Sequence, residues 1–270
     1  MSERAALTDA QIDALADANY VEFARELARW SGSDGRVLEC DGVVLVATGS
    51  DFPVTANEVV RLDRSADSAA VIATADAWFG EMGRGYSVST CGIGAGEDDL
   101  VVAAEAAGLL RVMDSPAMVC ASRLADAVAP EGIELREITT ASEVADFIAV
   151  NDAAYQSLGM PGGVIVDMVR SAELLLAPHV RTVIAYEGST PLATAQLLLS
   201  HGVAGVYFVG TVEAARGRGL AELVTRAVTN IGFDLGAAFV TLQASSMGEP
   251  IYRRMGYEER YRYTTHTRFV

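Results

Sequence analysis

The segment Val209-Gly-Thr-Val-Glu-Ala-Ala-Arg-Gly-Arg-Gly-Leu-Ala221 decides the fold of the second half of the chain. Its first residues are typical of a strand, and Arg216 to Gly219 form a glycine-rich turn. An apolar stripe from Leu220 to Leu235, followed by Gly236 where a C-cap is expected, predicts a long helix over about 218–235. The first N–H groups of a helix have no intrahelical partner and lie at the positive end of its dipole. The segment therefore predicts a site that binds phosphate.

The residues of the turn indicate that its ligand is a diphosphate. Gly217 and Gly219 let the backbone donors approach a ligand without an intervening Cβ, and Arg216 and Arg218 add positive charge. A Walker A loop needs a lysine, and the chain has none. A Rossmann fingerprint needs a third glycine, and Glu222 follows the helix start instead. ATP hydrolysis and NAD binding are therefore disfavoured.

Strand and helix patterns alternate through the second half of the chain, which follows a Pro- and Gly-containing boundary at 126–132. Alternating or continuous apolar runs predict strands, and apolar residues at helical spacing predict helices. Strands are predicted at 133–138, 180–186, 192–199, 206–212 and 239–242, with one or two closing strands over 257–269; helices are predicted at 142–154, 164–176 and 249–255 besides the long one.

The first half gives a looser version of the same order, with helices near 12–30, 66–82 and 98–107 and strands near 37–39, 43–47, 86–91, 110 and 118. We interpret this as a degenerate internal repeat. The predicted fold class is α/β (α+β), with two mixed central sheets, each flanked by helices. One predicted domain spans 1–128 and the other spans 131–270.

Composition restricts the partners of the protein. The 270 residues carry a formal charge of −16, which disfavours nucleic acid and anionic membranes and favours cationic substrates. No run of about 20 uncharged apolar residues is present to cross a bilayer. The opening Met-Ser-Glu-Arg lacks the features of a signal peptide, so we expect a cytoplasmic protein. The three cysteines, Cys40, Cys91 and Cys120, are far apart, and we expect no metal site.

Two motifs resemble the GNAT superfamily of N-acetyltransferases. Arg216-Gly-Arg-Gly219-Leu-Ala221 is similar to the superfamily motif Arg/Gln-x-x-Gly-x-Gly/Ala, and it lies in the same strand, turn and helix. Gln243-Ala-Ser-Ser-Met-Gly-Glu-Pro-Ile-Tyr252-Arg-Arg-Met-Gly256-Tyr257 looks like the later helix of that superfamily. The resemblance implies a tandem GNAT protein with a degenerate first domain, which lacks the cofactor motif, and an acetyl-CoA-binding catalytic domain at 131–270.

The resemblance also implies residue roles, with acetyl-CoA as the co-substrate and no metal. Backbone groups of Val209, Gly210 and Thr211 would pair with the pantetheine arm, where their strand splays from the one at 239–242. The pyrophosphate would lie on the amides of Arg216, Gly217, Arg218, Gly219, Leu220 and Ala221. Tyr252 would protonate the departing thiolate. Glu213, where a proline is common, and Ser245, where an asparagine is common, depart from the pattern.

The general base is not visible in the sequence. His179, His201 and His266 have no carboxylate at a telling spacing, and we expect them at the surface. A free amine can lose its proton through water, or the carboxylate of Val270 can assist, as the similarity to some tandem members suggests. Tyr257 is expected in the core.

The acceptor is not identified by any motif. The function predicted is direct acetyl transfer to the primary amine of a small molecule or peptide, selected by loops at 155–164 and 200–205. The runner-up is a non-catalytic acyl-CoA-binding regulatory or scaffold module, and a nucleotide-binding protein is a third reading. The glycine-rich Cys91 to Asp99 segment lacks the spacing of a phosphate loop, so the first half would shape the cleft or form a homodimer.

Overall fold

Strands from both halves of the chain form one continuous sheet in the computed structural model, which describes residues 7–94 and 96–270. The opening residues that argued against a signal peptide lie outside this part. The 11 strands lie in the order β1-β2-β3-β4-β11-β5-β10-β9-β8-β7-β6. Their bounds are β1 Arg36–Cys40, β2 Val43–Ala47, β3 Asn57–Arg61, β4 Tyr86–Cys91, β5 Leu110–Cys120, β6 Ile133–Glu137, β7 Val180–Glu187, β8 Thr190–Ser200, β9 Val203–Thr211, β10 Val240–Gln243 and β11 Glu258–Arg268.

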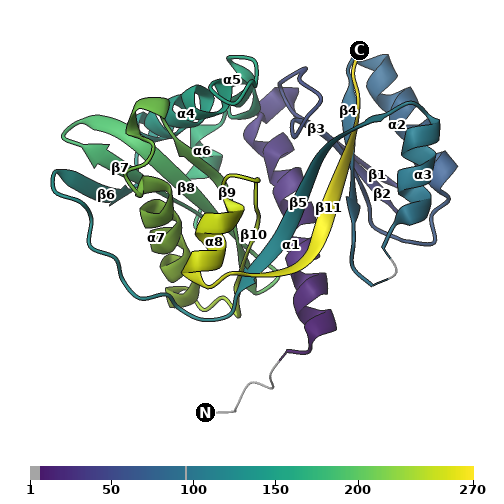
Figure 1. Cartoon of the computed structure of the whole chain (residues 1–270). Helices are drawn as coiled ribbons and strands as arrows, with labels where there is room; N and C mark the ends of the chain where they lie inside the picture. The colour runs from purple at the N-terminus through teal and green to yellow at the C-terminus, as the bar shows by residue number, and fades with distance from the viewer. Residues whose placement is uncertain (1–6, 95) are drawn as a thin grey trace.

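Helices cover both faces of the sheet (Figure 1). The helix α7 packs on one face of the second half, and α4 packs on the opposite face of the same strands. The bounds of the α-helices are α1 Asp9–Trp30, α2 Ser68–Glu81, α3 Asp98–Ala106, α4 Ala141–Gln156, α5 Val164–Met168, α6 Ala172–Leu175, α7 Leu220–Asp234 and α8 Glu249–Met255.

The helix α1 joins the two halves. It begins at a capping box in which the Thr8 hydroxyl accepts from the Gln11 amide and the Gln11 side chain accepts from the Thr8 amide. In Figure 1 it runs down the middle of the molecule, between the helices of the first half and those of the second. Asn19 donates to the Leu198 carbonyl of β8 at 3.1 Å, while Tyr20 donates to the Glu58 carboxylate of β3.

The two halves repeat one arrangement and exchange one strand. The parallel pair β3 and β4 is connected by α2, and the parallel pair β9 and β10 is connected by α7. The sequence predicts the repeat and the mixed α/β class, and both are present, but the two expected sheets are joined into one. The strand β5 of the first half pairs with β10, and β11 of the second half pairs with β4. Because of this exchange, β4, β5 and β10 each have a hydrogen-bonded strand on both sides.

Most predicted elements are present with shifts of a few residues. The strand β3 was not predicted, the helix expected at 164–176 is divided into α5 and α6, and the closing segment is the single strand β11. The predicted boundary at 126–132 lies in the loop between β5 and β6. The segments 1–128 and 131–270 share one sheet, because β11 of the second segment lies between β4 and β5 of the first.

The helix that follows the glycine-rich turn is fixed by its apolar stripe. Leu220, Leu223, Val224 and Val228 are buried against the sheet. Burial of each such side chain contributes about 1.5–3 kcal/mol relative to exposure. Gly236 follows the helix with φ +88°, a left-handed conformation that glycine adopts without strain. This packing holds the first turn of α7 at the end of β9.

Candidate cofactor-binding and catalytic site

The strand β9 is irregular just before the glycine-rich turn. Thr194 pairs with Gly210 and Gln196 with Tyr207, so Phe208 and Val209 of β9 lie opposite the single residue between them on β8. Phe208 is part of this β-bulge and has φ +48°, a left-handed conformation that is uncommon for a bulky residue. Within the described residues, β9 pairs with β10 only as far as Val206 and Leu242. The strands therefore separate at Val209, Gly210 and Thr211, where the resemblance implied a splay.

Two glycines shape the turn between β9 and α7. Gly217 has φ +77° and Gly219 has φ +75°, a left-handed region that side-chain-bearing residues rarely adopt. A Cβ built on either glycine would meet nothing within 4 Å, so the space above both is open. The glycines are required for backbone conformation and leave a free approach to the turn.

The turn and the first turn of α7 present a run of unpaired donors. Across residues 7–94 and 96–270, none accepts a hydrogen bond from the backbone N–H groups of residues 217–222. The first paired amide of the helix is that of Leu223, which donates to the Gly219 carbonyl at 3.0 Å. Free amides at the positive end of a 15-residue helix form an anion-binding arrangement.

The side chains of the two arginines in the turn have different partners. Arg218 is paired with Glu187 of β7 at 2.7 Å. Arg216 donates to the carbonyl of Ala154 at 3.3 Å and to the hydroxyl of Ser157, both at the end of α4. Of these two arginines, Arg216 is the one whose hydrogen-bond acceptors are all uncharged.

Two buried polar atoms at the separation of β9 and β10 also have no hydrogen-bond partner among the described residues. They are Oγ1 of Thr211, the last residue of β9, and Nε2 of Gln243, the last residue of β10. An unpaired buried polar group costs free energy, so native structures usually supply a partner. An acceptor-rich chain such as pantetheine, lying between the two strands, would supply it.

Tyr252 lies in α8, beside the same strands. It is 7% exposed and its ring centroid is 6.0 Å from that of Tyr257. Burial raises the pKa of the Tyr252 phenol well above its usual value, the nearby Tyr155 phenol adds to the increase, and the Thr225 hydroxyl opposes it. The phenol is therefore protonated at neutral pH. Tyr257 is in the core, as predicted, and its hydroxyl lies 2.7 Å from that of Thr229.

Tyr155 is a further candidate for the site, although the sequence indicated only the loop that it begins. It lies near the end of α4, and burial raises its pKa to about 12. Its phenol is close enough to that of Tyr252 to influence the pKa of Tyr252. In the sequence, the only indication of a role for Tyr155 was its position at the start of the predicted loop 155–164.

Solved structures resemble the chain over most of its length. A GCN5-related N-acetyltransferase from Kribbella flavida is 20% identical, with 93% of this chain and 94% of that chain covered and a TM-score of 0.69. One from Sphaerobacter thermophilus is 17% identical, with 96% and 90% covered and a TM-score of 0.61. A tandem GNAT protein from the clavulanic acid biosynthesis pathway is 13% identical, with 84% and 78% covered and a TM-score of 0.57. The chain has the tandem GNAT fold. No protein-family model and no curated protein matches the sequence.

In the first half, the connection between β3 and α2 corresponds to the turn between β9 and α7, and a network of charged side chains lies there. Arg61, at the end of β3, pairs with Glu97 at 2.8 Å and with Asp99 at 2.7 Å. Arg61 also donates to Ser68, the first residue of α2, at 3.0 Å. Hydrogen bonds from Arg61 and Ser68 lower the pKa of Asp99 well below its usual value. Asp67 caps α2 by accepting from the amide of Ala70. Internal charges thus take the place of an external anion.

The GNAT fold excludes two residues considered as a base. His266 is completely buried, contrary to the expectation that it lies at the surface, because β11 is a central strand and not an edge. Val270 follows the far end of β11, beside Gly85. The 11 residues of that strand span roughly 35 Å at ~3.3 Å per residue, so the terminal carboxylate is remote from α8.

Of the two loops predicted to select the acceptor, one lies next to the glycine-rich turn and the other lies away from it. The loop at 155–164 adjoins the turn through the contact of Arg216 with Ser157. The turn at 200–205 lies at the opposite end of β9 from Thr211, so the expectation that it selects the acceptor finds no support in its position.

The basic residues near the C-terminus are mostly neutralised. Arg253 pairs with Glu249, Arg260 pairs with Asp13, and Arg262 pairs with Asp114. Arg254 is 63% exposed and lies 4.0 Å from Glu222, which is in the first turn of α7. Arg254 is thus the weakly paired member of this group, and it lies beside the first turn of α7.

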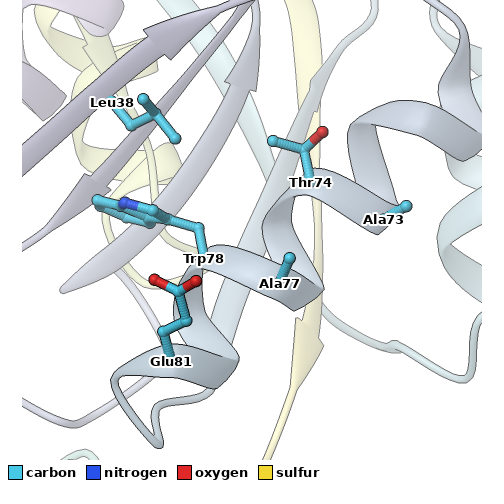
Figure 2. A pocket seen from close by; sticks show the side chains of 6 residues that line it. All are labelled: Leu38, Ala73, Thr74, Ala77, Trp78 and Glu81. Atoms are coloured by element: carbon cyan, nitrogen blue, oxygen red, sulfur yellow. The ribbon is translucent and has the colours of Figure 1, made fainter.

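A surface hollow in the first half lies apart from this site. Figure 2 shows it between β1 and α2, with the Trp78 ring beside Leu38, and its lining comprises Leu38, Ala73, Thr74, Ala77, Trp78 and Glu81. Within the described part of the chain, no group of three or more His, Cys, Asp or Glu side chains is placed to hold a metal ion. No described helix combines the length and apolarity needed to cross a bilayer.

Proposed function

We propose that this chain is a cytoplasmic N-acetyltransferase that moves an acetyl group from acetyl-CoA directly to the primary amine of a small molecule or peptide. The observation that carries the proposal is the run of unpaired amides at 217–222, at the start of α7 and beside separated strands. A diphosphate linked to an extended arm fits both features. We assign the cofactor site to the segment 131–270, and assign to 1–128 a role in shaping the cleft.

The binding roles follow from the local backbone. The amides from Gly217 to Ala221 hold the pyrophosphate, with no Cβ in the way at Gly217 and Gly219. The amide of Arg216, which the resemblance also implied, already donates to the Glu213 carbonyl at 3.2 Å, so Arg216 contributes through its side chain. The irregular end of β9, from Val209 to Thr211, has backbone groups free to pair with the pantetheine arm as an added strand does.

Tyr252 acts on the leaving sulfur. A thiol has a pKa of about 8.5 and a phenol one of about 10, so full proton transfer to a thiolate is uphill by roughly 2 kcal/mol. Burial of Tyr252 makes the transfer harder still. Tyr252 therefore serves as a hydrogen-bond donor that stabilises the developing thiolate, and water completes its protonation.

The amine must be neutral when it attacks. We propose that it loses its proton to water, since His266 is completely buried and Val270 lies beyond the far end of β11, beside Gly85. The charge of −16 attracts cationic acceptors to the protein. The acceptor class beyond a primary amine is left to experiment.

Thermal stability with acetyl-CoA, CoA, ATP and NAD tests the proposal, because a ligand that binds only the folded state raises the Tm. We expect a shift with the two CoA compounds alone. Gly219→Glu should abolish it, because a carboxylate side chain repels phosphate and φ +75° strains a side-chain-bearing residue. No shift with CoA would contradict the proposal.

Catalysis needs a second measurement. If CoA binds but no thiol is released from acetyl-CoA across a broad panel of amines, the chain is an acyl-CoA-binding regulatory or scaffold module instead. Thiol release with one acceptor, lost in Tyr252→Phe, supports the transferase.

A further inference from the structure

A contact between the glycine-rich turn and α4 has no role in the function proposed so far. The guanidinium of Arg216 donates to the Ala154 carbonyl at 3.3 Å and to the Ser157 hydroxyl. Both acceptors are neutral. Arg218, in the same turn, is paired with the carboxylate of Glu187 at 2.7 Å. The turn therefore contains one arginine held by an ion pair and one held only by neutral acceptors.

The acceptors of Arg216 lie where α4 ends. The last carbonyls of a helix have no intrahelical partner and lie at the negative end of its dipole, so a cation there stabilises the helix end. The chain continues from Ser157 as Leu-Gly-Met-Pro-Gly-Gly163. The other end of this segment is held by Asp152, which accepts from the Gly163 amide at 2.9 Å. The segment 157–163 is thus tied down at both ends.

We propose that Arg216 is a positioning residue that releases the segment 157–163 when the cofactor binds. The inference rests on the proposed function, because it takes the pyrophosphate of CoA as the ligand of the turn. That anion competes with the Ala154 carbonyl and the Ser157 hydroxyl for one guanidinium. Charge-assisted hydrogen bonds are about twice as strong as neutral ones, so Arg216 moves to the phosphate. The end of α4 then loses its tether to the glycine-rich turn, while the Ser157 hydroxyl keeps its bond to the Ala154 carbonyl.

Release of this end affects the catalytic side of the site. Ala154 immediately precedes Tyr155, a buried tyrosine that contributes to the raised pKa of Tyr252. The carbonyl held by Arg216 therefore belongs to the same helical turn as a phenol near the proposed hydrogen-bond donor. Binding of the cofactor frees Tyr155 and the segment 157–163 to adjust around the acceptor.

Hydrogen exchange of the full-length protein, with and without CoA, tests the inference. The amides of Leu158, Gly159 and Met160 donate to carbonyls of the last turn of α4, at 2.9, 2.9 and 3.1 Å. In the wild type we expect CoA to accelerate exchange of these amides roughly tenfold, the effect of losing a hydrogen bond from a charged donor. In Arg216→Gln they should exchange fast without CoA and show no further change with it.

Arg218→Gln is the matched control, because it removes the other charge of the turn and leaves the contact with α4 intact. It should weaken CoA binding yet keep the acceleration of 157–163 at saturation.

Two outcomes would overturn this inference and leave the proposed function standing. In the first, CoA protects 217–222 in the wild type while 157–163 keeps its rate. In the second, Arg216→Gln without CoA exchanges as the wild type does. Absence of any protection at 217–222 with CoA would instead remove the proposed function, and the inference with it.

Discussion

Replacing Gly248 by alanine should damage the proposed chemistry and spare the fold. Gly248 has φ −80° and ψ −35°, which alanine adopts without strain. A Cβ at this position would lie 2.7 Å from Cε2 and 3.3 Å from the phenolic oxygen of Tyr252. The ring must therefore move by about 0.8 Å to regain a contact distance of ~3.5 Å. Gly248 thus determines where the proposed donor lies.

The expected loss of activity can be separated from any loss of stability. A misplacement near 1 Å lowers the rate by up to about 100-fold, so we expect kcat for thiol release to fall about 10- to 100-fold. Overpacking costs about 1–3 kcal/mol, and replacing glycine recovers about 0.4–1 kcal/mol through the unfolded state. The Tm of a chain of this size should therefore fall by no more than about 5 °C.

Two controls make the test decisive. Gly80→Ala, in α2, adds a Cβ with nothing within 4 Å, so it should leave kcat unchanged and raise the Tm by about 1–2 °C through the unfolded state. Adding Gly248→Ala to Tyr252→Phe should cause little further loss, because the two changes act on one group. If Gly248→Ala alone retained kcat within about twofold, the position of the phenol would not matter. The role assigned to Tyr252 would then be wrong.

Other substitutions address the remaining parts of the molecule. Tyr252→Phe removes the hydrogen-bond donor to the thiolate, so it should lower kcat about 100-fold and leave the KM for acetyl-CoA nearly unchanged in steady-state assays. Arg254→Gln should weaken CoA about 3- to 10-fold by calorimetry, with no change for dephospho-CoA, if its exposed guanidinium meets the 3′-phosphate. Glu97→Gln removes one charge from the buried network with Arg61 and should cost about 3–5 kcal/mol in urea unfolding, with the Tm shift caused by CoA preserved. Burial raises the pKa of Glu58, so its contribution to stability is full below its unfolded pKa and is lost as pH rises through the folded pKa. Glu58→Gln should therefore match the wild type near about pH 4 and be more stable near about pH 8 in urea unfolding, and equal stability at both pH values would contradict this.

The sequence predicts the site best where local chemistry determines structure. Glycines at 217 and 219 indicate a left-handed turn, and the apolar stripe after them indicates a helix, because both patterns act over a few residues. The structure has both features. The separation of β9 from β10 was also anticipated through the resemblance.

Elements whose stability comes from distant partners were harder to predict. The strand Asn57–Arg61 contains polar residues at 57, 58 and 61, which obscure an apolar pattern, yet all of β3 is buried. Asn57 donates to backbone carbonyls, Glu58 accepts from Tyr20, and Arg61 pairs with Glu97. These partners are brought together only by the tertiary fold, so no local pattern could reveal them. The same holds for Tyr155 beside Tyr252.

The exchange of strands makes the proposed site a product of both halves. The strand β10 is bordered by β9 on one side and by β5, from the first half, on the other. The Gln243 end of β10 pairs with Ala117 of β5, and the next amide, of Ala244, donates to the Pro116 carbonyl at 2.9 Å. The chain then enters α8 and reaches Tyr252. We assign no cofactor site to the first half, yet its strand β5 holds the end of β10 from which the chain leads to the proposed donor. The first half is therefore still required for the geometry of the second.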